Sequence, residues 1–392
     1  MHGTDPFLLQ LLVIFIWAKI FGEVFEQIAL PAVLGEILAG VVMGPYAAAY
    51  VAPTETVESV AGLGAIFLLF SVGLETHPKE LIHVGRHSMR VAIGGVAVPF
   101  IFGFAYMMLI HAKASEATFV ATAMVATSVG ITARVLGDMQ VLQTRAAKII
   151  LAAAVFDDIL GMVLLAVVAG LAAAGGVNYA QLLVLGIESL AFALFMIFIA
   201  PRVIHRMRGG LQRMSTQNAP LILALGICLA LSVAAEKIGM AAIIGAFFAG
   251  IAFAEYSPEW NLHPRVSALT EFLAPVFFFV MGAKLNLTVL GTRSVVTTAL
   301  VVSFLAVISK LIGCGLPTLK EGWRTALKVG VGMMPRGEVG LIVALVGLRS
   351  GIVTEDSYAV VMIMTAVTTL LAPPILRMLF RQEQSISTSA TG

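Results

Sequence analysis

Charged residues are scarce in this chain. Only 12% of its 392 residues are charged and 59% are hydrophobic, with a mean hydropathy of +1.00, whereas an ordinary soluble domain is about 25% charged. This composition excludes an ordinary soluble protein and indicates a polytopic membrane protein. The formal net charge is only +2, and no block of like charges suggests nucleic acid as a partner.

Cysteine and catalytic motifs are scarce as well. Cys228 and Cys314 lie far apart in apolar segments, which provides neither a disulfide framework nor a cluster of metal ligands. The sequence also lacks a nucleophile–base arrangement, a phosphate-binding loop and a transition-metal motif. We therefore expect neither an enzyme nor a cofactor. The apolar stretch that begins at Phe7 has no basic segment before it and no cleavage site after it, so it is predicted to be a retained span.

Long apolar stretches, by contrast, fill the chain. A helix of about 20 apolar residues crosses the hydrocarbon core of a bilayer, so the sequence predicts an all-α protein of 13 transmembrane spans in one integral membrane unit. The approximate limits are 7–28, 31–45, 57–75, 88–111, 117–137, 145–174, 179–201, 217–235, 239–256, 266–283, 289–316, 324–348 and 355–379. The polar residues 381–392 are predicted to form a disordered tail.

Lysine and arginine are distributed unevenly over the predicted loops. One alternating set of loops carries sixteen of them and the other set carries five. Because positively charged short loops stay in the cytoplasm, we expect a multi-pass protein of the cytoplasmic (inner) membrane. Its N-terminus would lie outside and its C-terminus inside.

The two halves of the chain resemble each other weakly. Matching residues recur at offsets of 209 or 210, in the pairs Gly35 and Gly245, Gly40 and Gly250, Phe70 and Phe279, and Gly73 and Gly282. This alignment predicts two inverted six-helix repeats, 1–174 and 216–380, joined by a linking helix in 175–215. Inverted repeats are typical of secondary transporters, whose sites lie near the bilayer midplane where interrupted helices meet.

Two of the predicted spans contain residues that interrupt a helix. Pro335 lacks an N–H group, and several glycines surround it in span 324–348. In span 117–137, Thr127, Ser128 and Thr132 can satisfy backbone groups that a break around Gly130 would free. We predict two broken helices that cross at mid-membrane, where Arg336 and Glu338 compensate the partial charges of the helix ends. Cation binding by Glu338 is an alternative.

Asp157 and Asp158 stand together in the otherwise apolar run 149–174. An intramembrane carboxylate is costly and typically marks an ion or proton site. Adjacent helical residues point about 100° apart, so the two acids are predicted to have different roles. Apolar surroundings favour a protonated carboxyl group, which lets a proton compete with a hard cation. Oxygen ligands suit alkali ions, and sodium, lithium and potassium stay open.

Lys310 is another charged residue inside a predicted span, 289–316. A buried lysine needs an acidic partner or loses its proton. We predict a breakable pair between Lys310 and Asp157, weakened when a cation binds Asp158. The structural alternative is a permanent pairing of the two acids with Lys310 and Arg336.

With these motifs, the chain resembles bacterial sodium/proton antiporters of the monovalent cation:proton antiporter superfamily, in particular NapA-like members of the Kef-related branch. The resemblance implies a homodimer with interleaved core and dimerisation domains, elevator-like alternating access and a role in pH homeostasis. It implies that Asp158 is the shared ion and proton carrier, that Thr127 and Ser128 lie beside the ion, and that exchange is electrogenic. The early end of the chain favours a free-standing antiporter over a gated Kef system.

Three other functions stay open at this stage. A potassium/proton antiporter would use the same scaffold and the same acids. A passive channel would conduct without obligatory counter-transport. A symporter of organic anions would use a related crossing of helices, although an aspartate pair with an intramembrane lysine suits proton competition better.

Overall fold

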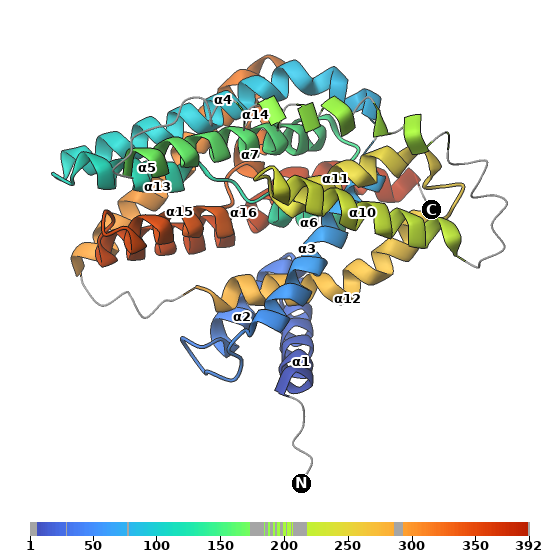
Figure 1. The fold of residues 1–392 in the computed structure, drawn as a ribbon, viewed down its shortest axis with the longest axis horizontal. Coiled ribbons are helices and arrows are strands. Elements are labelled where there is room, and N and C mark those ends of the chain that lie inside the picture. Colours follow the sequence, from blue (N-terminus) through green and yellow to red (C-terminus); the bar gives the residue numbers. More distant parts are fainter. Residues whose placement is uncertain are drawn as a thin grey trace, which may run out of the picture.

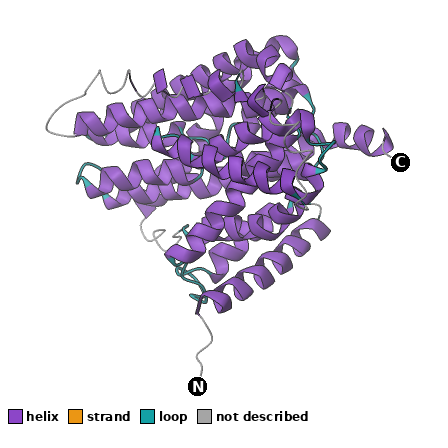
Figure 2. Ribbon diagram, turned by 45° about the vertical axis from the view of Figure 1, so that its right-hand side comes forward, coloured by secondary structure: helices purple, strands orange, loops and turns teal. Residues whose placement is uncertain are grey.

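The computed structural model describes residues 6–28, 30–76, 78–172, 218–285 and 293–390, with isolated residues between 184 and 206. Within this part of the chain all regular structure is helical (Figure 2). Eight helices are long and apolar enough to cross a membrane, and three shorter apolar helices accompany them. The prediction of an all-α membrane protein is therefore confirmed for the described residues.

The helices coincide with the predicted spans, one or two helices to a span. In chain order they are α1 (Pro6–Gln27), α2 (Ala32–Met43), α3 (Glu55–Leu74), α4 (Pro78–Leu109), α5 (Ala114–Val125), α6 (Val129–Asp138), α7 (Arg145–Ala172), α10 (Ala219–Lys237), α11 (Ala242–Phe253), α12 (Leu262–Ala283), α13 (Arg293–Gly315), α14 (Trp323–Gly332), α15 (Glu338–Arg349) and α16 (Glu355–Ala390). Span 179–201 and the linking helix predicted in 175–215 lie largely outside the described residues. The count of 13 spans therefore stays a prediction.

The helices pack in two groups, each of which combines helices from both halves of the chain. We call α1, α2, α3, α10, α11 and α12 the scaffold group, and α4, α5, α6, α7, α13, α14, α15 and α16 the core group. Figure 1 shows α1, α2 and α12 at one end of the molecule and α4, α5 and α7 at the other. The groups meet where α2 and α3 contact α6 and where α2 contacts α16.

Glycines let the helices of the scaffold group approach closely. At seven of them an added Cβ atom would collide with a backbone oxygen of the facing helix, and four of these form the reciprocal pairs Gly40–Phe279, Gly282–Ile37, Gly250–Phe70 and Gly73–Phe247. The first two pairs join α2 to α12 and the last two join α3 to α11. Small residues at such crossings are typical of membrane helices. The two crossings are related by the same offsets of 209 and 210 that relate the halves of the sequence.

The core group contains a comparable crossing, which provides a first test. A Cβ on Gly94 of α4 would collide with Gly313 O of α13, so we expect Gly94→Ala to destabilise the protein by about 1–3 kcal/mol through overpacking. The matched control is Gly85→Ala on the same helix, where nothing lies within 4 Å of the added atom and alanine should stabilise by about 0.5–1 kcal/mol. Thermal unfolding of the purified protein measures both. Equal unfolding temperatures for the two variants would contradict the close crossing.

The end of the chain differs from the sequence prediction. Helix α16 continues to Ala390, whereas a disordered tail was predicted from residue 381 onward. Two contacts from α14 reach the first part of this extension: Lys328 Nζ lies 2.5 Å from Glu383 Oε1 and 4.6 Å from the centroid of the Phe380 ring. Figure 2 shows the end of the helix projecting from the body of the molecule.

Candidate functional site

Two spans are interrupted, as predicted. Helix α5 ends at Val125 and α6 begins at Val129, with Ser128 in an extended conformation before α6 (φ −97°, ψ 105°). Helix α14 ends at Gly332 and α15 begins at Glu338. Pro335 lies in the second interruption, where its missing N–H group and fixed φ oppose a continuous helix.

The two interruptions lie against each other and satisfy each other's backbone groups. Three hydrogen bonds join them: from Ser128 N to Pro335 O (2.8 Å), from Thr132 Oγ1 to Gly332 O (2.7 Å) and from Thr127 Oγ1 to Met333 O (3.4 Å). Backbone polar groups at membrane depth need such partners, because no water is available in the hydrocarbon. The residues around the break between α5 and α6 therefore stabilise the break between α14 and α15 by hydrogen bonding to its carbonyl groups.

Arg336 lies fully buried beside the breaks. Its guanidinium donates to Met334 O, to Met124 O (2.6 Å) and, more weakly, to Ala306 O (3.4 Å). Met124 is in the last turn of α5, where carbonyl groups lack helical partners and carry partial negative charge. The side chain thus neutralises a helix end at the crossing. Glu338 is the first residue of α15, and its side chain lies outside the described part of the structure.

Asp157 and Lys310 lie together in the interior of the core group. Lys310 Nζ is 3.4 Å from Asp157 Oδ1, and the two side chains are 0% and 3% exposed. Sequence reasoning missed Gly95 of α4, which leaves room for this pair. A Cβ at position 95 would lie 2.7 Å from Cys314 Sγ and 3.4 Å from Lys310 Nζ. The only sequence signal was the Gly94–Gly95 pair in an apolar helix.

Asp158 faces a different environment from its neighbour. It is partly exposed and lines a cavity of about 10 Å³ between the two groups of helices. The other lining residues are apolar: Leu69 of α3, Val129 of α6, Leu151, Ala154 and Val155 of α7, and Ile243, Ile244 and Phe247 of α11. A volume of this size is close to that of one water molecule. One carboxylate is thus turned into the core group and the other toward the boundary between the groups.

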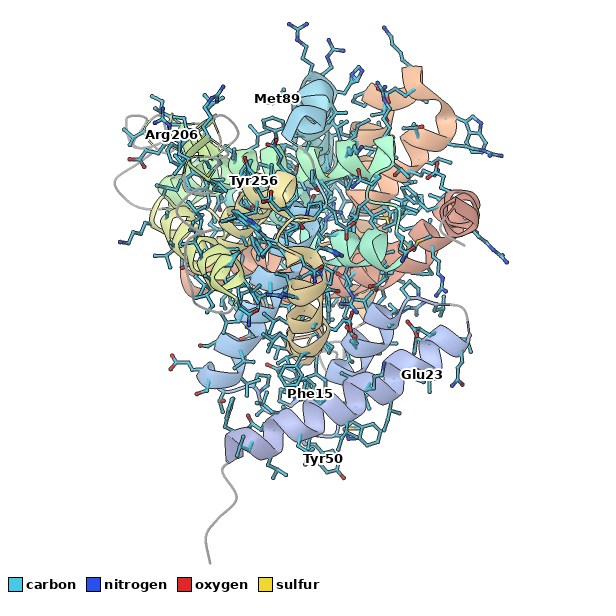
Figure 3. All side chains as sticks on the ribbon, turned by 90° about the vertical axis from the view of Figure 1, so that its right-hand side faces the viewer. Phe15, Glu23, Tyr50, Met89, Arg206 and Tyr256 are labelled. Atoms are coloured by element: carbon cyan, nitrogen blue, oxygen red, sulfur yellow. The ribbon has the colours of Figure 1, made fainter. Side chains whose placement is uncertain are left out.

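A second cavity is much larger, with a volume of about 1090 Å³. It is lined by residues of α1, α2, α3, α6 and α12, and we call it the vestibule. Phe15 and Glu23, which Figure 3 labels on α1, belong to its wall. Leu68 and Ala133 line the vestibule, whereas Leu69 and Val129 line the cavity of Asp158. Helices α3 and α6 therefore contribute residues to the walls of both cavities.

The part of the chain that the structure describes contains no group of three or more His, Cys, Asp or Glu side chains arranged to hold a metal ion. The oxygen atoms of the site are instead the carboxylates of Asp157 and Asp158 and the hydroxyl and carbonyl groups at the two helix breaks. Such a set suits weakly held alkali cations better than divalent or transition metals.

Comparisons with known proteins agree on one family. The family model described as "Sodium/hydrogen exchanger, transmembrane" matches residues 11–382. The high-affinity Na⁺/H⁺ antiporter NhaS3 of Synechocystis sp. is 34% identical over 413 residues, which cover 95% of this chain and 89% of that protein. The Na⁺/H⁺-K⁺ antiporter GerN of Bacillus cereus is 31% identical over 377 residues, with coverage of 95% and 96%. The sodium proton antiporter MjNhaP1 of Methanocaldococcus jannaschii has a similar fold, with a TM-score of 0.67 at 17% identity over 96% of this chain and 97% of that one.

Proposed function

Since this chain belongs to the sodium/hydrogen exchanger family, we propose that Asp158 is the site where the two substrates of a cation/proton antiporter compete. The protein exchanges sodium for protons across the membrane as a transporter. GerN is named a Na⁺/H⁺-K⁺ antiporter, which keeps potassium as the alternative cation. Lithium is a further candidate, because it is also a small, hard alkali ion.

The position of Asp158 is the observation that carries this proposal. Asp157 is engaged by Lys310 at 3.4 Å, whereas Asp158 lines a cavity between the core and scaffold groups. A carboxylate at such a boundary can be reached from one side of the membrane and, after relative movement of the groups, from the other. In a largely apolar wall, a bound proton or cation stabilises the carboxylate by neutralising its charge. Because Asp158 can hold either a proton or a cation but not both, binding of one releases the other, and the two ions are exchanged.

The recurring glycine crossings support an architecture of two inverted repeats in which the core and scaffold groups move against each other. The α2–α12 and α3–α11 crossings are related by the repeat offsets, as two inverted repeats require. The core group would then move against a dimerising scaffold group in elevator-like alternating access. The predicted orientation, with the N-terminus outside and the C-terminus in the cytoplasm of an inner-membrane protein, places the vestibule on the cytoplasmic side.

Exchange in proteoliposomes tests this function. With a pH-sensitive dye inside the vesicles, an inward sodium gradient should drive protons outward, and parallel gradients of lithium and potassium rank the cations. A potassium response equal to or larger than the sodium response would favour the alternative antiporter. Cation current without obligatory proton movement would reject antiport altogether.

The pair formed by Asp157 and Lys310 gives a second prediction. Because the buried contact joins opposite charges, Asp157→Asn and Lys310→Gln should be non-additive, with a coupling energy of about 1–3 kcal/mol in thermal unfolding. The rate of sodium/proton exchange in the two single variants and the double variant, measured under a clamped membrane potential, tests whether the pair determines how much net charge each exchange cycle carries. Additive effects in both measurements would mean that the contact has no role, while leaving Asp158 as the proposed carrier.

A further inference from the structure

Glu36 of α2 is a buried carboxylate without a role in the exchange site. It is only 6% exposed, yet it lines the vestibule. Its Oε2 atom has no hydrogen-bond partner. A buried carboxylate oxygen that receives no hydrogen bond is costly. Its position therefore indicates a partner that enters from the cavity.

The basic side chains of the vestibule do not provide that partner. Arg134 Nε donates to Asp138 Oδ2 at 3.1 Å on the same helix, and His263 Nε2 lies 2.5 Å from Glu75 Oε1. Lys19 is exposed. Among the described residues, no ion pair within 4.0 Å involves Glu36. A proton, or a cation that enters the vestibule, can neutralise its charge.

The charge of the vestibule wall favours such a cation. Its basic side chains are Lys19, Arg134 and His263. Its acidic side chains are Glu23, Glu26, Glu36, Glu75, Asp138 and Glu271. A cleft lined mainly by one sign of charge concentrates the opposite ion, by about tenfold or more.

The geometry also selects the class of cation. No three carboxylate, thiol or imidazole groups converge on a metal position in the described residues, whereas divalent ions usually require several protein oxygens. The vestibule has room, at about 1090 Å³, for an ion that keeps most of its water. A single buried carboxylate facing this space suits a partly hydrated monovalent cation.

We propose that Glu36 forms a second binding station for a partly hydrated alkali cation in the vestibule, occupied before the ion reaches Asp158. The two acids lie on opposite sides of the boundary, Glu36 on α2 of the scaffold group and Asp158 on α7 of the core group. Helices α3 and α6 contribute residues to the walls of both cavities. Only the identity of the ion as sodium rests on the proposed antiport.

Sodium binding to variants of the full chain tests the station without transport. Thermal unfolding of the purified protein is measured in sodium chloride and in choline chloride of equal ionic strength. Ligand binding to the folded state raises the unfolding temperature, so Asp158→Asn should keep a sodium-dependent rise. The double variant Asp158→Asn/Glu36→Gln should lose it. No rise in the first variant, or the same rise in both, overturns the proposal.

Transport kinetics separate a specific station from general attraction. Glu36→Gln should raise the sodium concentration for half-maximal exchange by about threefold to tenfold, with the maximal rate retained. The matched control is Glu271→Gln, which removes one charge from the same wall at an exposed residue already bonded by Ser267 (3.2 Å), and its shift should be less than about twofold. Equal shifts would assign the effect to overall charge and overturn the station. Absence of exchange in the unaltered chain would reject the proposed antiport, while the unfolding measurement still decides on Glu36.

Discussion

Replacing Asp158 with asparagine is expected to abolish sodium-driven proton movement. The substitution keeps the shape of the side chain but removes the negative charge for which a proton and a cation compete. The remaining lining of its cavity is apolar, so no neighbouring wall residue can take over the charge. We expect a loss of at least about 100-fold in exchange rate, which corresponds to about 2.7 kcal/mol. Dye quenching in proteoliposomes measures it.

The control for this variant is Asp356→Asn, at an exposed acid in the first turn of α16. It should exchange at the rate of the unaltered protein, and both variants should elute as folded protein in size-exclusion chromatography. Exchange at more than about a tenth of the original rate by a folded Asp158→Asn protein would be incompatible with Asp158 as the shared carrier.

Truncation of Arg336 should cause the largest loss of stability. Arg336→Ala removes the donors to Met334 O, Met124 O and Ala306 O, and these carbonyl groups lie where water cannot replace the lost hydrogen bonds. Ala306 O keeps the hydroxyl of Ser309 at 3.1 Å. Each buried acceptor left without a partner costs about 1–3 kcal/mol, so loss at Met334 O and Met124 O is expected to total about 2–6 kcal/mol. A fall in the thermal unfolding temperature of the purified protein reports it.

Two further variants make this prediction specific. Arg336→Lys keeps the charge but loses the planar fork of donors, so it should be intermediate in stability. Arg324→Ala, at an exposed arginine stacked on Trp323 (5.6 Å), should change stability by less than about 0.5 kcal/mol. If Arg336→Ala unfolds at the temperature of Arg324→Ala, the guanidinium does not hold the crossing together.

The local features of the site could be predicted from the sequence because they depend on neighbouring residues. Pro335 together with the glycines around it favours a break, whereas Pro99 and Pro275 lie inside continuous helices. The hydroxyl groups near Ser128 mark the other break. The helical period alone separates the directions of Asp157 and Asp158. It does not say which acid faces Lys310, because that depends on where α13 lies relative to α7.

Contacts between distant segments could not be predicted in the same way. Glu36 looked like an ordinary residue of span 31–45, because the vestibule that it lines exists only after α1, α2, α3, α6 and α12 have packed. Gly95 gave no functional signal, since its importance comes from the Lys310 side chain of another helix. The first part of the α16 extension contacts Lys328 of α14.

By itself, the sequence determined that the chain is a helical membrane protein, where two of its helices break and which acids stand at membrane depth. These properties follow from solvation and backbone geometry, which act over a few residues. Only the tertiary structure decided that Asp157 pairs with Lys310, that Asp158 lines a cavity at the boundary of two helix groups and that Glu36 is left without a partner. The reason is physical: ion pairs, cavities and unsatisfied charges are formed by packing residues that are far apart in the chain.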